Sequence, residues 1–310
     1  MNRFACLFPG QGSQSVGMGK DLYEHSPTAR EYFERADAAL GYSISRLCFE
    51  GPEDELRLTR NAQPALLTAS VISYVLLGSE PALAAGHSLG EYSAHVAAGT
   101  LEFEDAVKLV QLRGTYMQDA VPVGVGAMAA VLGADESAIR EALDETEGAV
   151  VEVANWNSPD QVVIAGHKEA VDNAVRRIKP PKFVMLPVSA PFHTRLMKPA
   201  EDKLAAKLDG VLFRNPKFPV IANVDASPVS TGEEARTGLK RQVSRPVLWT
   251  ASMEILRNEG IGLCVETGPG KVLSGLMKRM SRGWPKPPVL ANVENWESLE
   301  KARQAVSDFL

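Results

Sequence analysis

The chain has 310 residues, of which 45% are hydrophobic, 23% charged and 6% aromatic. These proportions are ordinary for a folded globular protein and exclude a disordered, fibrous or collagen-like chain. The 33 Lys and Arg residues are outnumbered by 38 Asp and Glu, and this net charge of -5 argues against nucleic acid as a partner. No apolar run approaches the roughly 18 residues of a membrane span, so we expect neither a membrane partner nor a signal segment.

The three cysteines, Cys6, Cys48 and Cys264, are odd in number and far apart in the sequence. Without a C-x-x-C pair they support neither a disulfide framework nor a zinc site. We therefore expect a reduced, cytoplasmic protein with core thiols, no metal and no other cofactor.

Short apolar runs alternate with longer helical patterns through most of the sequence. The runs expected to form strands cover residues 4–8, 82–85, 219–222, 263–266 and 289–291. The helical patterns include residues 28–40, 64–77 and 102–117, the second of which opens at Pro64 and ends before Gly78. This alternation predicts an α/β fold with a mainly parallel central sheet, covered by helices on both faces.

The middle of the chain breaks this rhythm. Strand, helix, strand, strand, helix and strand patterns follow in turn over residues 127–132, 136–145, 150–154, 161–165, 168–178 and 183–188. This βαββαβ order is typical of a ferredoxin-like subdomain. We therefore predict a large α/β domain from residues 1–124 and 190–310, with a small subdomain, residues 125–189, inserted between junctions near Val125 and Ser189. Because clefts between domains are favoured ligand sites, we expect chemistry near these junctions.

The strongest single motif is G-x-S-x-G at residues 86–90, directly after an expected strand and before a helical pattern over residues 91–98. Its glycines permit a sharp strand-to-helix turn that exposes the Ser88 hydroxyl as a nucleophile. A second interpretation stays open, because Ser88 and Glu91 also form the S-x-x-E pattern of a capping box, in which the serine merely caps the helix.

A serine nucleophile needs a general base, and the chain has five histidines. His193 is the best candidate, because it lies in an irregular segment at the second junction, where its side chain can project into a cleft. The sequence places no carboxylate to orient it, so a dyad held by a carbonyl is as plausible as a triad. The remaining histidines fit structural or surface positions: His25, His87, His95 and His167.

Two further features have open interpretations. The glycine-rich turn over residues 9–14 is a weak phosphate site, because Ser15 occupies the last glycine position of G-x-G-x-x-G. Donation from this turn and from the Leu89 N–H to a developing oxyanion is the more useful interpretation. Arg113 lies in an apolar helical pattern, where a guanidinium either extends to solvent or pairs with a carboxylate.

A local basic cluster contains Lys278, Arg279, Arg282 and Lys286. It could dock a small acidic partner protein even though the chain is acidic overall. It could equally be the solvated end of a helix, where cations are favourable.

Together these motifs resemble the malonyl-CoA:acyl carrier protein transacylases of fatty acid synthesis and the related acyltransferase domains of polyketide synthases. The resemblance covers nearly the whole chain, and its departures are small, such as Trp156 where a tyrosine is common. The matching motifs are residues 8–14 (FPGQGSQ), 86–92 (GHSLGEY), 111–114 (QLRG), 155–166 (NWNSPDQVVIAG), 191–193 (PFH), 242–249 (QVSRPVLW) and 266–270 (ETGPG).

The resemblance implies that Ser88 is the acylated nucleophile and His193 its base. It also implies that a main-chain carbonyl near Gln242 holds the imidazole, which agrees with the missing carboxylate. Gln11 and the N–H of Leu89 are implied to form the oxyanion hole.

The resemblance also implies the substrate contacts. Arg113 is expected to pair with the free carboxylate of a malonyl group, so the resemblance favours a binding role for this residue over a side chain that extends to solvent. Phe192 resembles the malonyl-selective form of its segment, in which a bulky ring restricts room for a methyl branch. Asn155 and Asn157 match positions near the pocket, and we expect a binding role for them.

The implied reaction is a ping-pong transfer of malonyl from malonyl-CoA to the phosphopantetheine thiol of acyl carrier protein, by a monomer without a cofactor. Three alternatives stay open at this point. One is a serine hydrolase or thioesterase with water as acceptor, and another is a non-catalytic module that binds a carrier protein. The third, within the family, is service in a polyketide or malonate decarboxylase system.

Overall fold

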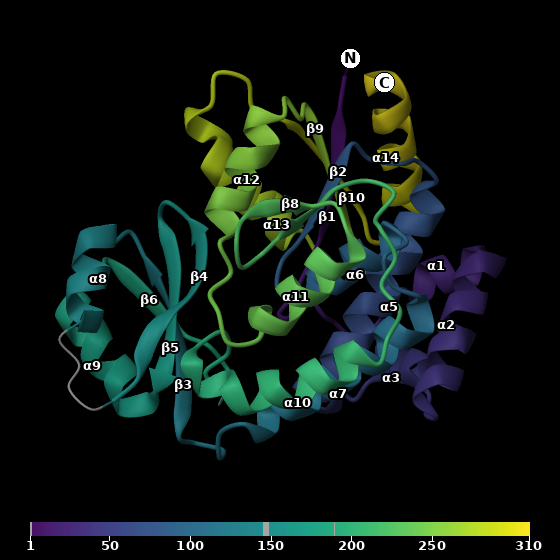
Figure 1. The fold of residues 1–310 in the computed structure, drawn as a ribbon. Helices are drawn as coiled ribbons and strands as arrows, with labels where there is room; N and C mark the ends of the chain where they lie inside the picture. The colour runs from purple at the N-terminus through teal and green to yellow at the C-terminus, as the bar shows by residue number, and fades with distance from the viewer. Residues whose placement is uncertain (1, 145–148, 189) are drawn as a thin grey trace.

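The computed structural model describes residues 2–144, 149–188 and 190–310. Two separate sheets with their helices organise this part of the chain (Figure 1). The expected helix end at Glu145 and the expected junction at Ser189 lie outside the described residues.

The central sheet has six strands in the order β10-β9-β1-β2-β7-β8. Its strands are β1 (Phe4–Phe8), β2 (Leu83–Gly86), β7 (Val220–Ala222), β8 (Ser227–Val229), β9 (Leu263–Thr267) and β10 (Val289–Val293). Every neighbouring pair is parallel except β7 and β8, which are antiparallel. The prediction of a mainly parallel α/β sheet is confirmed, and β8 is a short edge strand that the apolar runs did not reveal.

Alternate residues of β1 belong to two different cores, as the period of two in a strand requires. Phe4, Cys6 and Phe8 pack into one core, whereas Ala5 and Leu7 pack into the other. The first core is covered mainly by α2 (Pro27–Leu40), α5 (Thr59–Leu77), α7 (Phe103–Asp119) and α14 (Trp296–Phe309). The second is covered by α12 (Trp249–Asn258) and α13 (Val272–Met280). This double cover explains why the strands are continuous apolar runs.

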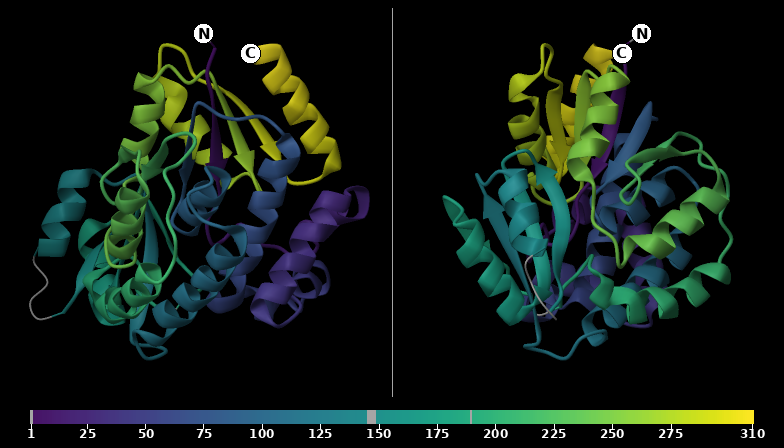
Figure 2. Two further views of the ribbon diagram at one scale, coloured as in Figure 1. Left: turned by 45° about the vertical axis from the view of Figure 1, so that its right-hand side comes forward. Right: turned by 60° about the vertical axis from the view of Figure 1, so that its left-hand side comes forward.

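The central sheet and all the helices that accompany it, together called the large layer below, also include the remaining helices of this part of the chain. They are α1 (Lys20–His25), α3 (Ile44–Glu50), α4 (Glu53–Arg57), α6 (Leu89–Ala97), α10 (Lys198–Asp209) and α11 (Gly232–Gln242), with the 3-10 turns η1 (Arg195–Met197) and η2 (Ser281–Gly283). The start of β1 and the end of α14 lie together at one end of the central sheet (Figure 2). The opposite end, where the parallel strands terminate, faces the second sheet.

The second sheet is antiparallel and has the order β4-β5-β3-β6. Its elements are β3 (Gly126–Leu132), α8 (Glu136–Asp144), β4 (Val151–Ser158), β5 (Gln161–His167), α9 (Lys168–Ile178) and β6 (Lys182–Met185). This βαββαβ order and strand arrangement confirm the expected ferredoxin-like unit. The division into domains at residues 124/125 and 189/190 stays a prediction.

Backbone hydrogen bonds tie the second sheet to the large layer. Trp156 N donates to Val247 O at 2.9 Å, and Val247 N donates to Ala154 O at 2.9 Å. The segment before α12 therefore pairs with β4 through a single parallel bridge between Asn155 and Val247. This connection fixes one wall of the space between the two sheets.

One predicted helix start is wrong. Residue Pro64 lies inside α5, which begins five residues earlier, at Thr59. Pro64 removes one internal hydrogen bond, to the carbonyl of Arg60, and the helix continues because it is buried along most of its length. The extension matters for the site, because it places Gln63 on the same helix as the apolar face that packs on the sheet.

Candidate active site

Three neighbouring strands of the central sheet end at the same edge, and a functional segment follows each. Gln11 follows β1, Ser88 follows β2 and Asn223 follows β7. In an open parallel sheet this carboxyl edge is where ligands bind. The candidate site is therefore built on strand ends that the sheet holds in fixed register.

The turn at Ser88 is a sharp, strained elbow. Ser88 has φ 52° and ψ -107°, a backbone conformation that residues other than glycine rarely adopt. A Cβ on Gly86 would lie 2.0 Å from the Gly90 carbonyl, and one on Gly90 would lie 2.0 Å from the Phe8 carbonyl oxygen. Both glycines are thus required by close backbone approach, as the motif predicts.

The Ser88 hydroxyl faces a histidine and does not cap the helix. Its Oγ lies 2.7 Å from His193 Nε2, and no side-chain cap bond forms at the start of α6. Glu91 also does not reach back to the N-cap, because its carboxylate accepts hydrogen bonds from Asn223 and Gln242 instead. The capping-box interpretation is therefore wrong.

The tautomer of His193 follows from its partners. Nδ1 lies 2.9 Å from the main-chain oxygen of Gln242, which can only accept, so Nδ1 carries the proton. Nε2 is then free to accept from the Ser88 hydroxyl. Burial, reinforced by the positive charge of Arg113, lowers the pKa of His193 to about 3, so the imidazole is neutral near pH 7. A neutral imidazole is the state a general base needs.

Asn223 braces the elbow, and the sequence analysis missed it. Its side-chain oxygen accepts from Ser88 N at 2.7 Å, and its Nδ2 donates to Gly86 O at 2.7 Å. A polar residue directly after the apolar run 219–222 was the available signal, because such positions lie at the carboxyl edge of a sheet.

Arg113 is 1% exposed and donates to three oxygens. Nη1 donates to Gln63 Oε1 at 2.8 Å, and Nη2 donates to Gln242 Oε1 at 2.9 Å and to Ser88 Oγ at 3.1 Å. It neither extends to solvent nor forms an ion pair with a carboxylate among the described residues. Burial lowers the pKa of the guanidinium, yet arginine stays charged at neutral pH. An unpaired cation therefore lies beside the serine hydroxyl.

Two groups near Ser88 can donate to an oxyanion. Leu89 is the first residue of α6, so its N–H has no partner within the helix and lies at the positive end of the helix dipole. The Gln11 amide donates to Thr59 Oγ1 at 3.3 Å, a long bond that a better acceptor can replace. Both residues line the same cavity as Ser88.

That cavity has a volume of about 380 Å³ and draws its walls from both sheets. The strand β6 ends at Met185, and not at residue 188 as predicted. Residues 186–188 therefore lie outside the strand, where they line the cavity. Of the other expected binding residues, Phe192 and Asn155 are lining residues. Asn157 lies behind the wall, where its Oδ1 is 2.8 Å from His87 Nε2.

His87 also lines the cavity, although the sequence analysis assigned it only a structural position. Burial lowers its pKa, and its ring packs against Trp249 with centroids 5.3 Å apart. No sequence pattern indicated that His87 lines the cavity, because its position next to Ser88 predicts a side chain that points away from the nucleophile. A neutral polar wall results.

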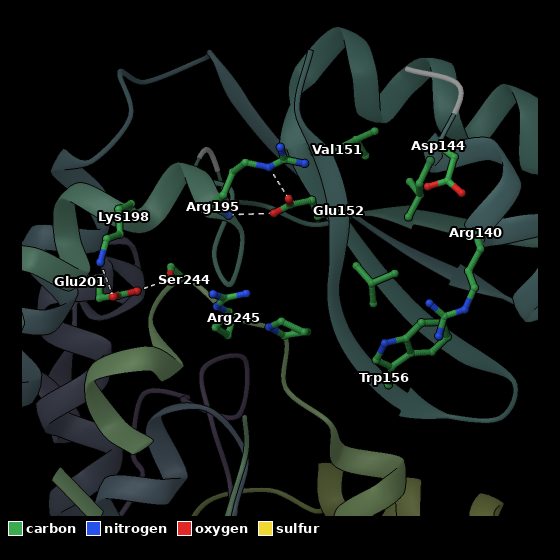
Figure 3. A pocket seen from close by; sticks show the side chains of 13 residues that line it. Arg140, Asp144, Val151, Glu152, Trp156, Arg195, Lys198, Glu201, Ser244 and Arg245 are labelled. Atoms are coloured by element: carbon green, nitrogen blue, oxygen red, sulfur yellow. Dashed lines mark hydrogen bonds and ion pairs between the residues drawn. The ribbon is translucent and has the colours of Figure 1, made fainter. Parts of the chain in front are cut away.

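A larger groove of about 860 Å³ lies between β4 and the start of α10 (Figure 3). Ion pairs join Arg195 to Glu152 and Lys198 to Glu201, and Ser244 donates to Glu201. Its described lining residues include neither Ser88 nor His193. The smaller cavity is therefore the candidate active site.

The described residues contain neither a metal-binding group nor a membrane-spanning helix. No group of His, Cys, Asp and Glu side chains in residues 2–144, 149–188 and 190–310 is arranged to hold a metal ion. No helix in the same residues has the length and apolar character needed to cross a membrane. Burial raises the pKa of all three cysteine thiols, which are buried and unpaired.

Taken together, the geometry provides a polarised serine, a neutral base with a fixed tautomer, oxyanion donors and a buried cation. A substrate with a carbonyl group and a nearby anionic group can interact with all four of these features. Acyl transfer through an ester on the serine is the chemistry these groups support.

Comparison with known proteins gives the same class of chemistry. The family model described as acyl transferase domain matches residues 5–296. The chain is 51% identical over 288 residues to "Malonyl CoA-acyl carrier protein transacylase" of Escherichia coli strain K12, covering 90% of this chain and 93% of that protein. The Bacillus subtilis strain 168 protein of the same name is 47% identical over 290 residues, covering 91% of this chain and 92% of that one.

Solved structures are also similar over nearly the full length. A malonyl-transacylase in complex with its type II PKS acyl-carrier protein has a TM-score of 0.94 and 44% identity, covering 98% of this chain and 100% of that chain. The malonyl CoA-acyl carrier protein transacylase from Coxiella burnetii has a TM-score of 0.94 and 41% identity, covering 98% of this chain and 97% of that chain.

Proposed function

The chain belongs to the acyl transferase domain family, and we propose that its transfer of malonyl from malonyl-CoA to acyl carrier protein proceeds through an ester on Ser88. The observation that carries this proposal is the continuous chain of contacts from the Gln242 carbonyl through His193 to Ser88, with Arg113 3.1 Å from the same hydroxyl.

The first half-reaction acylates the serine. His193 Nε2 takes the Ser88 proton as Oγ attacks the thioester carbonyl of malonyl-CoA. The N–H of Leu89 and the Gln11 amide stabilise the tetrahedral oxyanion. When the carbon–sulfur bond breaks, the CoA sulfur leaves with the proton from His193, and malonyl-Ser88 remains.

The second half-reaction reverses these roles. His193 takes the proton of the phosphopantetheine thiol as its sulfur attacks the malonyl-Ser88 ester. The same donors stabilise the second oxyanion, and Ser88 leaves with the proton from His193. The product is malonyl-carrier protein and the starting enzyme, so no cofactor is consumed.

Arg113 supplies the preference for an acyl group with a free carboxylate. The planar guanidinium can donate two parallel hydrogen bonds to the malonyl carboxylate, which replaces Ser88 Oγ as partner. An acetyl group leaves the same buried cation without an anion. Phe192 limits branched acyl groups, Asn155 contributes a polar wall, and Asn157 acts by holding His87.

The carrier protein is the expected partner, and the exposed basic cluster is a candidate for its docking. Lys278 and Arg279 lie in the last turn of α13, with Arg282 and Lys286 just beyond. None of the four forms an ion pair within the described residues, in contrast to Arg3, Arg35 and Arg241. Their charge is thus available to an acidic surface. We further infer a cytoplasmic monomer that serves fatty acid or polyketide synthesis.

Intact-protein mass spectrometry after incubation with malonyl-CoA tests the proposal. The parent chain is expected to gain one malonyl group, which a carrier protein with a free thiol removes. Ser88→Ala is expected to gain none, and a malonyl adduct on that variant would overturn the nucleophile assignment. Fast consumption of malonyl-CoA without a carrier protein would favour a hydrolase.

A further inference from the structure

Glu91 is a buried carboxylate that the mechanism above does not use. It lies on α6, three residues after Ser88, and is 1% exposed. Its Oε2 accepts from Asn223 N at 3.0 Å and from Gln242 Nε2 at 2.7 Å. The only positively chargeable group described within ion-pair range is His95, whose Nε2 is 3.9 Å from Oε1. Burial lowers the pKa of His95 to about 3, so this neighbour is neutral.

The Gln242 side-chain amide contacts three groups, and Glu91 helps to determine its direction, that is, which way its oxygen and its NH₂ point. Nε2 donates to Glu91 Oε2 and, at 2.9 Å, to Ser88 O, two atoms that accept. Oε1 accepts from Arg113 at 2.9 Å. A flipped amide would place its oxygen against two oxygens and its NH₂ against a guanidinium, so only one direction satisfies all partners.

This direction controls the cation that faces the substrate. Arg113 is held by two amide oxygens, those of Gln63 and Gln242, which orient the guanidinium without neutralising it. A carboxylate in place of either amide would compete with the substrate for the cation. Glu91 lies one step away, on the far side of the Gln242 amide, where its oxygen accepts from that amide and not from the guanidinium.

We propose that Glu91 is a positioning residue that fixes the direction of the Gln242 amide and thereby holds the Arg113 guanidinium, unneutralised, where an acyl carboxylate binds. The inference rests on the proposed function, in which Arg113 binds malonyl. It assigns Glu91 a role in selectivity for anionic acyl groups, in addition to packing.

Two substitutions separate this role from a loss of packing. Glu91→Gln keeps an oxygen that can accept from both Asn223 and Gln242, with its NH₂ toward neutral His95, so the amide direction survives. Glu91→Ala removes the acceptor. We expect the ratio of malonyl to acetyl acylation rates to stay within about threefold of the parent in Glu91→Gln and to fall about tenfold to hundredfold in Glu91→Ala, the effect of leaving one buried amide donor without its acceptor.

Glu266 provides a matched control. It is buried at the same edge of the sheet, where its carboxylate accepts from Leu273 N at 3.0 Å and Ser274 N at 2.8 Å at the start of α13. Glu266→Ala is expected to lower the melting temperature while the malonyl to acetyl ratio stays within threefold. An unchanged ratio in Glu91→Ala, or an equal fall in Glu91→Gln, would overturn the proposal. Absence of malonyl-Ser88 in the parent chain would instead overturn the proposed function.

A second set of variants applies if Glu91→Ala does not fold. Gln242→Glu places two carboxylates about 2.7 Å apart and is expected to lower the melting temperature. Adding Glu91→Gln replaces one of them by an amide that can donate, so part of the loss is recovered. The double variant also places a carboxylate on Arg113, so its malonyl to acetyl ratio falls. Recovery with a lower ratio supports the proposal, and a melting temperature no higher than that of Gln242→Glu alone contradicts it.

Discussion

Replacing Arg113 is the most direct test of how the site distinguishes acyl groups. Arg113→Ala removes a buried cation and leaves the oxygens of Gln63 and Gln242 to be satisfied by water. Each charge-assisted hydrogen bond contributes about 1.5–3 kcal/mol, so two parallel bonds to a malonyl carboxylate contribute about 3–6 kcal/mol. We therefore expect malonyl acylation to slow by roughly 10²- to 10⁴-fold, at about 1.4 kcal/mol for each factor of ten.

The rate of Ser88 acylation by an acetyl group serves as an internal control, because it shows whether the Arg113 variant is folded and its Ser88–His193 dyad still reacts. Acetyl has no carboxylate to lose, so its rate is expected to change by less than about tenfold, and it can rise because the unpaired cation is gone. Arg113→Lys keeps the charge but not the planar pair of donors, so its malonyl rate should be intermediate. The assay is single-turnover formation of acyl-enzyme, followed by mass spectrometry. Equal losses for malonyl and acetyl would refute the carboxylate assignment.

The other predictions concern the elbow, two titrations and the docking surface. Gly90→Ala should prevent folding or lower stability by more than about 3 kcal/mol in urea unfolding, because its Cβ would lie 2.0 Å from the Phe8 carbonyl oxygen. The pKa of His193 is lowered to about 3, so protonation of His193 should slow acylation only in strong acid. Removing the nearby Arg113 charge should raise this pKa, so the fall in acylation rate should begin at a higher pH. Burial raises the pKa of Glu91 from 4.5 to about 7, so the folded state binds the Glu91 proton more tightly than the unfolded state. The stability that this proton contributes is full below pH 4.5 and is lost as pH rises through 7. The melting temperature of the parent relative to that of Glu91→Gln should therefore fall between these two pH values. Reversing charge at Lys278 and Arg279 should raise the KM for carrier protein without changing acylation by malonyl-CoA, and an unchanged KM would remove the docking proposal.

The layers of this fold were predictable because burial leaves a strong sequence pattern. The parallel strands are buried on both faces, so they are short apolar runs, and β1 was placed at its observed limits. The glycines of the elbow were predictable for a different reason, since a missing Cβ at both positions is a rare local requirement. Pro64 predicts a helix start because proline favours the first turn of a helix, but it lies in the second turn of α5, where burial of the helix outweighs the lost hydrogen bond.

The polar groups that orient the site were less visible, because each acts across a long separation in sequence. Gln63, Asn223 and Gln242 come from a helix, a strand end and another helix, and each is a single amide in an otherwise ordinary segment. Nothing in a local pattern distinguishes an amide that orients a guanidinium from one on a surface. The resemblance to a family predicted a role for the main-chain carbonyl near Gln242, but not for the Gln242 side-chain amide.

The arrangement around Arg113 explains why amides, and not carboxylates, occupy these positions. A buried arginine is usually stabilised by an acidic partner, because an uncompensated charge in the interior is costly. Here the adjacent acceptors are neutral, and the nearest carboxylate, Glu91, is one amide further away. The protein therefore bears part of the cost of an unpaired cation, and a bound acyl carboxylate removes it. Binding energy is largest for the acyl group that completes the ion pair, so the same cost that lowers the stability of the free enzyme provides its selectivity.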